Sequence, residues 1–266
     1  MTNQKFKYQA GCSLLIVLIL FNSSLSTQAS ERSHFVANSF LSSQRQENAI
    51  TQNLSALELF RKVYENRYTW DNQFPGYTAV VEIKQGNNKY NGNVRVNSDL
   101  NVEVTGIDNE QASQTVKNQL LMIAIHRRQT PFAVAHKNKT FEFGTAKNPG
   151  VVEILEAGGK TSARYQIASN QIVQVSRLLG PHNVVVKTLD TEVTPAGYIA
   201  TQYHSTFYDA KSDRLVGEET YTDTYKEVGN YYLLNRQVIQ TNENGNKSVV
   251  ELNFKQIKLM SSISKT

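Results

Sequence analysis

The second half of the chain reads as one extended segment after another. Beyond Pro131, nine segments favour strands, and turn-forming pairs such as Gly180-Pro181 and Asn244-Gly245 separate them. No helical pattern intervenes, which argues against a parallel β-α-β arrangement and predicts an antiparallel sheet. The expected strands are 140–143, 151–155, 164–168, 172–178, 184–190, 198–208, 218–225, 232–240 and 248–257.

Two amphipathic helices are expected before these strands. Ser55-Ala56-Leu57-Glu58 matches a capping box, and apolar residues at helical spacing follow it, which predicts a helix ending between Arg67 and Trp70. A second helix is expected over 109–128, with Asp108 as its N-cap and Thr130-Pro131 after its end. Its apolar stripe consists of Ala112, Val116, Leu120, Ile123 and Ala124.

Three strands lie between these helices. From Tyr77 the apolar period changes from 3.6 to 2, with Ala79, Val81 and Ile83 on one face. Two further extended segments, 90–97 and 100–104, follow across short turns and predict a meander. The expected fold class is therefore α+β, with one large curved antiparallel sheet, a half-barrel, and two main helices packed on its concave face.

The N-terminus has the pattern of an export signal. Lys5 and Lys7 precede an apolar run, and small residues up to Ala29 form a cleavage site, so 1–29 is predicted to be a signal peptide cut after Ala29. The run is shorter than the ~20 residues of a membrane-spanning helix, so a retained anchor is the weaker alternative. We expect a polar linker over 30–53, a single domain over 54–260, a tail over 261–266, and a periplasmic or other extracytoplasmic location.

Charge and cysteine content exclude several functions. Lys and Arg number 28 against 23 Asp and Glu, a net charge of +5, and the expected cleavage removes two lysines and no acidic residue. So small an excess argues against nucleic-acid binding. The single cysteine, Cys12, lies in the predicted signal, so the mature chain has no disulfide, no thiol nucleophile and no Cys-ligated metal.

One stretch of sequence resembles a known family. Tyr64-Glu65-Asn66-Arg67-Tyr68-Thr69-Trp70, followed by Phe74-Pro75-Gly76-Tyr77, is similar to the opening signature of the mainly cyanobacterial domain of unknown function three-three-eight-six. The resemblance spans 54–260 and implies no activity. Many members of that family lack an export signal, so 1–53 is a departure. The order of elements also resembles the half-barrel of periplasmic lipoprotein carriers, which implies a curved sheet around an apolar cavity.

Few residues stand out as candidates for chemistry. The five histidines show no metal-ligand spacing, and no catalytic motif is present, so neither a catalytic residue, a metal nor a cofactor is expected. His126 and Arg127 suit the C-terminal end of a helix, and alternatively an anionic-headgroup site. Tyr68, Trp70, Phe74 and Tyr77 either line a ligand cavity or, as the favoured interpretation, plug one end of the sheet.

Acidic residues in one late strand invite a catalytic interpretation. Asp223 lies between Tyr221 and Tyr225, and Glu218-Glu219 is nearby. Paired carboxylates can serve as acid and base. Alternating charge on an exposed strand face accounts for the same pattern, and we prefer this interpretation.

Three functions of different classes remain. The leading hypothesis is a non-enzymatic, exported protein that binds a lipid or other apolar ligand in the half-barrel and meets membranes only transiently. The second is an envelope structural or assembly module with an unidentified protein partner. The third is an enzyme with an unrecognised site near Asp223 or His204.

Overall fold

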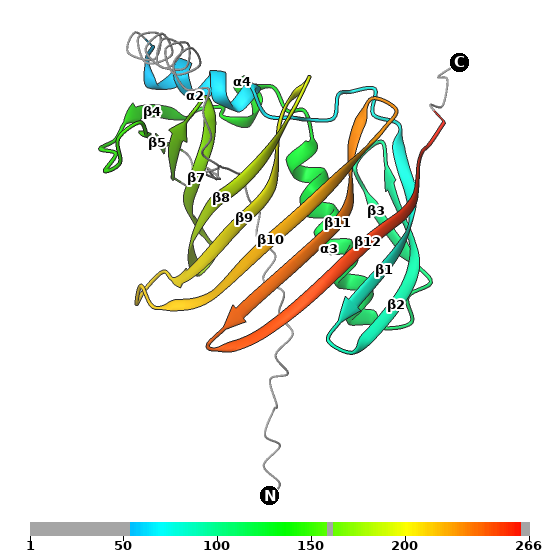
Figure 1. Ribbon diagram of the computed structural model, residues 1–266. Helices are drawn as coiled ribbons and strands as arrows, with labels where there is room; N and C mark the ends of the chain where they lie inside the picture. Colours follow the sequence, from blue (N-terminus) through cyan, green and yellow to red (C-terminus); the bar gives the residue numbers. More distant parts are fainter. Residues whose placement is uncertain (1–53, 159–161, 262–266) are drawn as a thin grey trace, which may run out of the picture.

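Twelve antiparallel strands form one open sheet in the computed structural model, which describes residues 54–158 and 162–261 (Figure 1). The predicted signal peptide, its predicted cleavage site and the predicted linker lie outside the described residues. The strands are β1 (Gly76–Gln85), β2 (Asn88–Asn97), β3 (Val102–Thr105), β4 (Thr140–Phe143), β5 (Val152–Ala157), β6 (Ala163–Ala168), β7 (Gln171–Leu179), β8 (His182–Thr194), β9 (Gly197–Asp209), β10 (Leu215–Val228), β11 (Tyr231–Glu243) and β12 (Asn246–Leu259). The expected α+β class with its large antiparallel sheet is confirmed.

The strand order explains why a helix crosses the concave side. The order is β3-β2-β1-β12-β11-β10-β9-β8-β7-β6-β5-β4, so β3 and β4, neighbours in sequence, form opposite edges. The chain between them contains α3 (Glu110–Arg127), whose 18 residues extend over roughly 27 Å. Figure 1 shows α3 behind the curved sheet, between its two edges. This helix therefore bridges the open half-barrel.

The helix termini follow from local capping. In α2 (Ala56–Glu65) the Ser55 side chain accepts from the Glu58 backbone N–H, and the Glu58 carboxylate accepts from the Ser55 N–H, which forms the predicted capping box. The predicted N-cap of the second helix was wrong by one residue. Asn109, not Asp108, accepts from the Ala112 N–H at 2.8 Å, because α3 begins at Glu110.

The described chain also has a third helix that was not expected. The four-residue α4 (Phe132–Ala135) follows Pro131 directly, where we predicted only the end of the second helix. Proline disfavours helical backbone in the residue before it but is itself compatible with a first helical turn. Pro131 therefore separates α3 from a new, short helical turn.

Each long helix covers its own part of the sheet. Along α3, Ala112, Val116 and Leu120 pack in one apolar core with residues of β1, β2, β11 and β12. Along α2, Phe60 and Val63 belong to a second core, built on β5, β6 and β7. Strands β8, β9 and β10 lie between most of these two cores in the sheet order, although Ile199 of β9 belongs to the first core and Tyr225 of β10 packs against it. The centre of the concave face is thus flanked by two helix-covered regions.

Candidate functional site

The inward side of the central strands is polar. Side chains alternate between the two faces of a strand, so residues opposite each other in register share a face. Thr188 of β8 lies opposite Tyr203 of β9, Tyr203 opposite Tyr221 of β10, Ser205 opposite Glu219, and Asp223 opposite Gln237 of β11. We call this set the polar floor; its members are Thr188, Tyr203, Ser205, Glu219, Tyr221, Asp223 and Gln237.

A hydrogen-bonded chain connects the polar floor to α3. Arg127 Nη2 donates to the Tyr225 hydroxyl at 3.0 Å, and that hydroxyl donates to Asp223 Oδ2 at 3.0 Å. Gln237 Nε2 donates to Asp223 Oδ1 at 2.9 Å. Burial raises the pKa of Asp223 to about 6, although these hydrogen bonds and the charge of Arg127 act in the opposite direction. The Asp223 carboxyl group therefore titrates much closer to neutrality than an ordinary aspartate.

Glu219 is the second buried acid of the polar floor. The Tyr221 hydroxyl donates to Glu219 Oε2, and the Tyr221 ring stacks on Tyr203 with ring centres 4.6 Å apart. Loss of contact with water raises the pKa of Glu219. Asp223 and Glu219 are only 4% and 8% exposed, so the expectation of an exposed, alternating-charge face is wrong for these two carboxylates.

Several polar atoms at this centre have no hydrogen-bond partner. Thr188 Oγ1, Ser205 Oγ, Gln237 Oε1 and Arg127 Nε are all buried and unpaired. Leaving a buried donor or acceptor unsatisfied costs about 1–3 kcal/mol per group. Each such atom is one with which the polar group of a ligand, or a bound water, could form a hydrogen bond.

An apolar strip borders the polar floor. Val184 and Val186 of β8 and Phe207 of β9 form a separate buried cluster, in which Val184 lies opposite Phe207 and Val186 opposite Ser205. Among the described residues, this cluster consists of strand residues alone and includes none from α2, α3 or α4. The centre of the concave face thus combines apolar and polar groups side by side.

Positive charge gathers at the end of α3. Arg127 is 3% exposed and Arg67, in the segment after α2, is 7% exposed. Desolvation, followed by the charges of Arg127, Arg67 and Arg177 of β7, holds the pKa of His126 well below its usual range. Three different segments of the chain therefore bring guanidinium groups near one imidazole.

The four aromatic candidates lie in the core beneath α3. Tyr68, Trp70, Phe74 and Tyr77 are each no more than 4% exposed. Trp70 stacks on Phe74 with ring centres 4.2 Å apart, and its backbone N–H donates to the Arg127 carbonyl at 2.6 Å. The Tyr68 hydroxyl accepts from the Tyr232 N–H at 2.8 Å. The Arg127 guanidinium carbon lies 6.0 Å from the centre of the Tyr68 ring, so the fold brings together these two residues that the sequence singled out.

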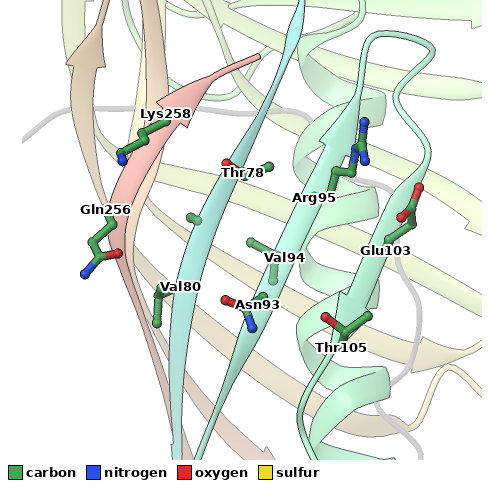
Figure 2. A pocket seen from close by; sticks show the side chains of 10 residues that line it. Thr78, Val80, Asn93, Val94, Arg95, Glu103, Thr105, Gln256 and Lys258 are labelled. Atoms are coloured by element: carbon green, nitrogen blue, oxygen red, sulfur yellow. The ribbon is translucent and has the colours of Figure 1, made fainter. Parts of the chain in front are cut away.

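Two hollows lie elsewhere on the described surface. A groove of about 400 Å³ crosses the outer face of β12, β1, β2 and β3, on the side of the sheet away from α3 (Figure 2). Two of its charged side chains, Arg95 and Glu103, have protein partners, since Arg95 Nε donates to Asn97 Oδ1 and Asn97 Nδ2 donates to Glu103 Oε1. The second, of about 320 Å³, lies between the end of α2 and the start of α4, and Arg67 lines it.

Two further histidines, His204 and His136, form local contacts. His204, on the outer face, lies 2.9 Å from Thr220 Oγ1 and 3.5 Å from Glu218 Oε1. His136 Nδ1 lies 3.0 Å from Glu156 Oε2, among aromatic rings at the α2 end. Within the described ranges, no group of three or more acidic, His or Cys side chains is placed to hold a metal ion. None of the described helices is both long and apolar enough to cross a membrane.

Comparison with solved structures finds matches that cover most of this chain at low sequence identity and low TM-score. A LolA-superfamily protein of Nitrosomonas europaea is 12% identical, with 80% of this chain and 96% of that one covered, at a TM-score of 0.30. A putative outer-membrane lipoprotein-sorting domain of Vibrio parahaemolyticus is 8% identical. The match covers 79% of this chain and 94% of that one, at a TM-score of 0.26. A DUF1329-family protein of Desulfovibrio piger is 9% identical. The match covers 79% of this chain and 93% of that one, at a TM-score of 0.29. Such low TM-scores carry no functional weight.

The family itself is defined by sequence. The family described as "Protein of unknown function (DUF3386)" matches residues 51–260, and the chain belongs to it. The resemblance noted from Tyr64 to Tyr77 is thereby confirmed. No curated protein matches the chain.

Proposed function

We propose that this protein is a non-enzymatic, exported binding protein that holds a lipid-like or other amphiphilic ligand against the centre of its concave face. The single observation that carries the proposal is the pair of buried, unpartnered atoms Thr188 Oγ1 and Ser205 Oγ beside the apolar strip of Val184, Val186 and Phe207. An apolar chain on the strip and a polar group on the floor would satisfy both surfaces at once.

The layout of the helices supports a ligand at this position. The two long helices cover the flanks of the sheet, and the strand-only cluster lies between them. Ligand pockets are largely apolar, with a few placed polar groups that fix orientation. The apolar strip and the adjoining polar floor together have that composition. Export would place the protein where it can receive such a ligand between membranes.

A bulky substitution on the strip tests the proposal. Val186→Phe is expected to place its ring in the space of the ligand, so the purified variant should release no lipid on extraction and show no ligand-bound mass by native mass spectrometry. The matched control is Val185→Phe, one residue away on the outer face of β8, where the added ring points away from the site. This control is expected to retain the bound mass of the unsubstituted protein.

Two outcomes would contradict the proposal. One is an unsubstituted protein that carries no bound mass and takes up none from mixed phospholipid vesicles. The other is a Val186→Phe variant that fails to fold while Val185→Phe folds normally, because protein side chains would then fill the space above Val186.

A further inference from the structure

Two of the arginines near His126 are buried charges without ion pairs. Arg67 and Arg127 are 7% and 3% exposed, and among the described residues neither forms a salt bridge; Arg177, half-buried, forms none either. An arginine stays protonated in proteins, and an unpaired buried charge strongly destabilises a fold. A fold retains such groups most readily where they serve to bind something of opposite charge.

The local hydrogen bonds leave donor capacity on these side chains. Arg127 uses Nη2 on the Tyr225 hydroxyl, while its Nε is buried and unpartnered. Arg67 donates from Nε to the Tyr64 carbonyl at 2.8 Å and stacks on the Tyr64 ring at 3.8 Å. Both contacts are with neutral groups. The guanidinium orientation is thus fixed, and the charge remains uncompensated.

The nearest carboxylates do not neutralise the group. The hydrogen bonds connect Asp223 to Arg127 only through the Tyr225 hydroxyl. The pKa of Asp223 is raised to about 6, so its carboxyl group loses its proton less readily than an ordinary aspartate. Glu156 accepts from Lys139 Nζ at 2.9 Å and lies 3.0 Å from His136 Nδ1, so its charge is already matched. The same arginines suppress protonation of His126. The end of α3 is therefore a preformed cationic site.

We propose that Arg127, Arg67 and Arg177 bind the anionic headgroup of the ligand, a phosphate or carboxylate, while its apolar chain lies on the strip of Val184, Val186 and Phe207. Arginine matches the geometry of both anions through paired N–H donors. This inference rests on the proposed function and names the ligand class: an anionic amphiphile rather than a neutral lipid.

The test compares three probes on the full chain by isothermal titration calorimetry: dihexanoyl phosphatidic acid, uncharged dihexanoylglycerol and inorganic phosphate. Arg127→Gln is expected to weaken phosphatidic acid binding by about tenfold or more, and to change dihexanoylglycerol binding by less than about twofold. The control is Arg128→Gln, which changes the next, exposed residue of the same helix end and is expected to bind like the unsubstituted protein.

The outcomes distinguish binding of an anionic lipid headgroup from binding of an apolar chain alone and from binding of free phosphate. Equal affinity for phosphatidic acid and dihexanoylglycerol overturns the anionic headgroup and leaves the apolar binding proposal standing. Phosphate binding as tight as phosphatidic acid binding, lost in Arg127→Gln, supports the cationic site and overturns the lipid source. Should Arg127→Gln fail to fold, the half-buried Arg177→Gln is expected to give the same selective loss, and unchanged binding in that variant contradicts the inference.

Discussion

Trp70→Ala is expected to lower the free energy of unfolding by about 3–5 kcal/mol, because it removes the largest side chain from the core under α3. Trp70 is 2% exposed, stacks on Phe74 and meets the Tyr77 ring edge-on at 6.2 Å. Its indole N–H also donates to the Tyr232 carbonyl at 3.4 Å. Chemical denaturation of the delipidated protein measures the effect.

The Trp70 substitution also decides whether the aromatic residues line a ligand cavity or plug one end of the sheet. If Trp70 connects helix and sheet, the ligand-free protein loses stability while ligand affinity in the folded fraction is preserved. A variant that unfolds like the unsubstituted protein and loses only ligand binding would instead place Trp70 in the binding cavity. Phe143→Ala, which truncates a 51% exposed aromatic on the edge strand β4, is the control and is expected to change stability little.

Asp223→Asn is expected to stabilise the protein at neutral pH. The folded-state pKa of Asp223 is raised from 3.8 to about 6, so the native state binds the proton more tightly than the unfolded chain. The contribution of this group to stability is complete below 3.8 and falls as the pH rises to about 6. Above that range the ionised Asp223 lowers the free energy of unfolding by about 3 kcal/mol, and the neutral amide in the Asp223→Asn variant avoids most of this loss.

The measurement is the difference in unfolding free energy between Asp223→Asn and the unsubstituted protein from pH 3.5 to 8. We expect a difference near zero at the acid end that grows in favour of the variant above pH 6. Asp213→Asn, in the exposed turn before β10, is the control and is expected to give no such pH-dependent gap. A variant that is less stable at pH 8 would show that the charged carboxylate is favourably held.

The elements were predictable because their signals are local. The capping box at Ser55, the alternation of Ala79, Val81 and Ile83, and the glycine-containing turns each depend on residues a few positions apart. The sheet order was not predictable in the same way. β1 pairs with β12, so that Val81 lies opposite Phe254, and no local pattern encodes a pairing across that distance in the chain.

The site was harder to predict than the fold. β10 carries polar residues on both faces, so its alternation does not tell which face is buried, and the sequence alone predicts exposed positions for Asp223 and Glu219. Their burial follows from the register with Gln237 and Ser205 on neighbouring strands. Arg127 was singled out from its place at a helix end, but its hydrogen bond to Tyr225 joins residues 98 positions apart. One sequence signal was available: Tyr221, Asp223 and Tyr225 recur at the strand period.

A crystal structure of the protein, purified without detergent from its native host, tests the proposed ligand-binding role most directly. We expect elongated non-protein density along Val184, Val186 and Phe207, with one end within hydrogen-bonding distance of Ser205 Oγ or Arg127 Nε. An interior in which the protein's own side chains occupy that space, with Ser205 and Gln237 satisfied by them, would contradict the proposed function.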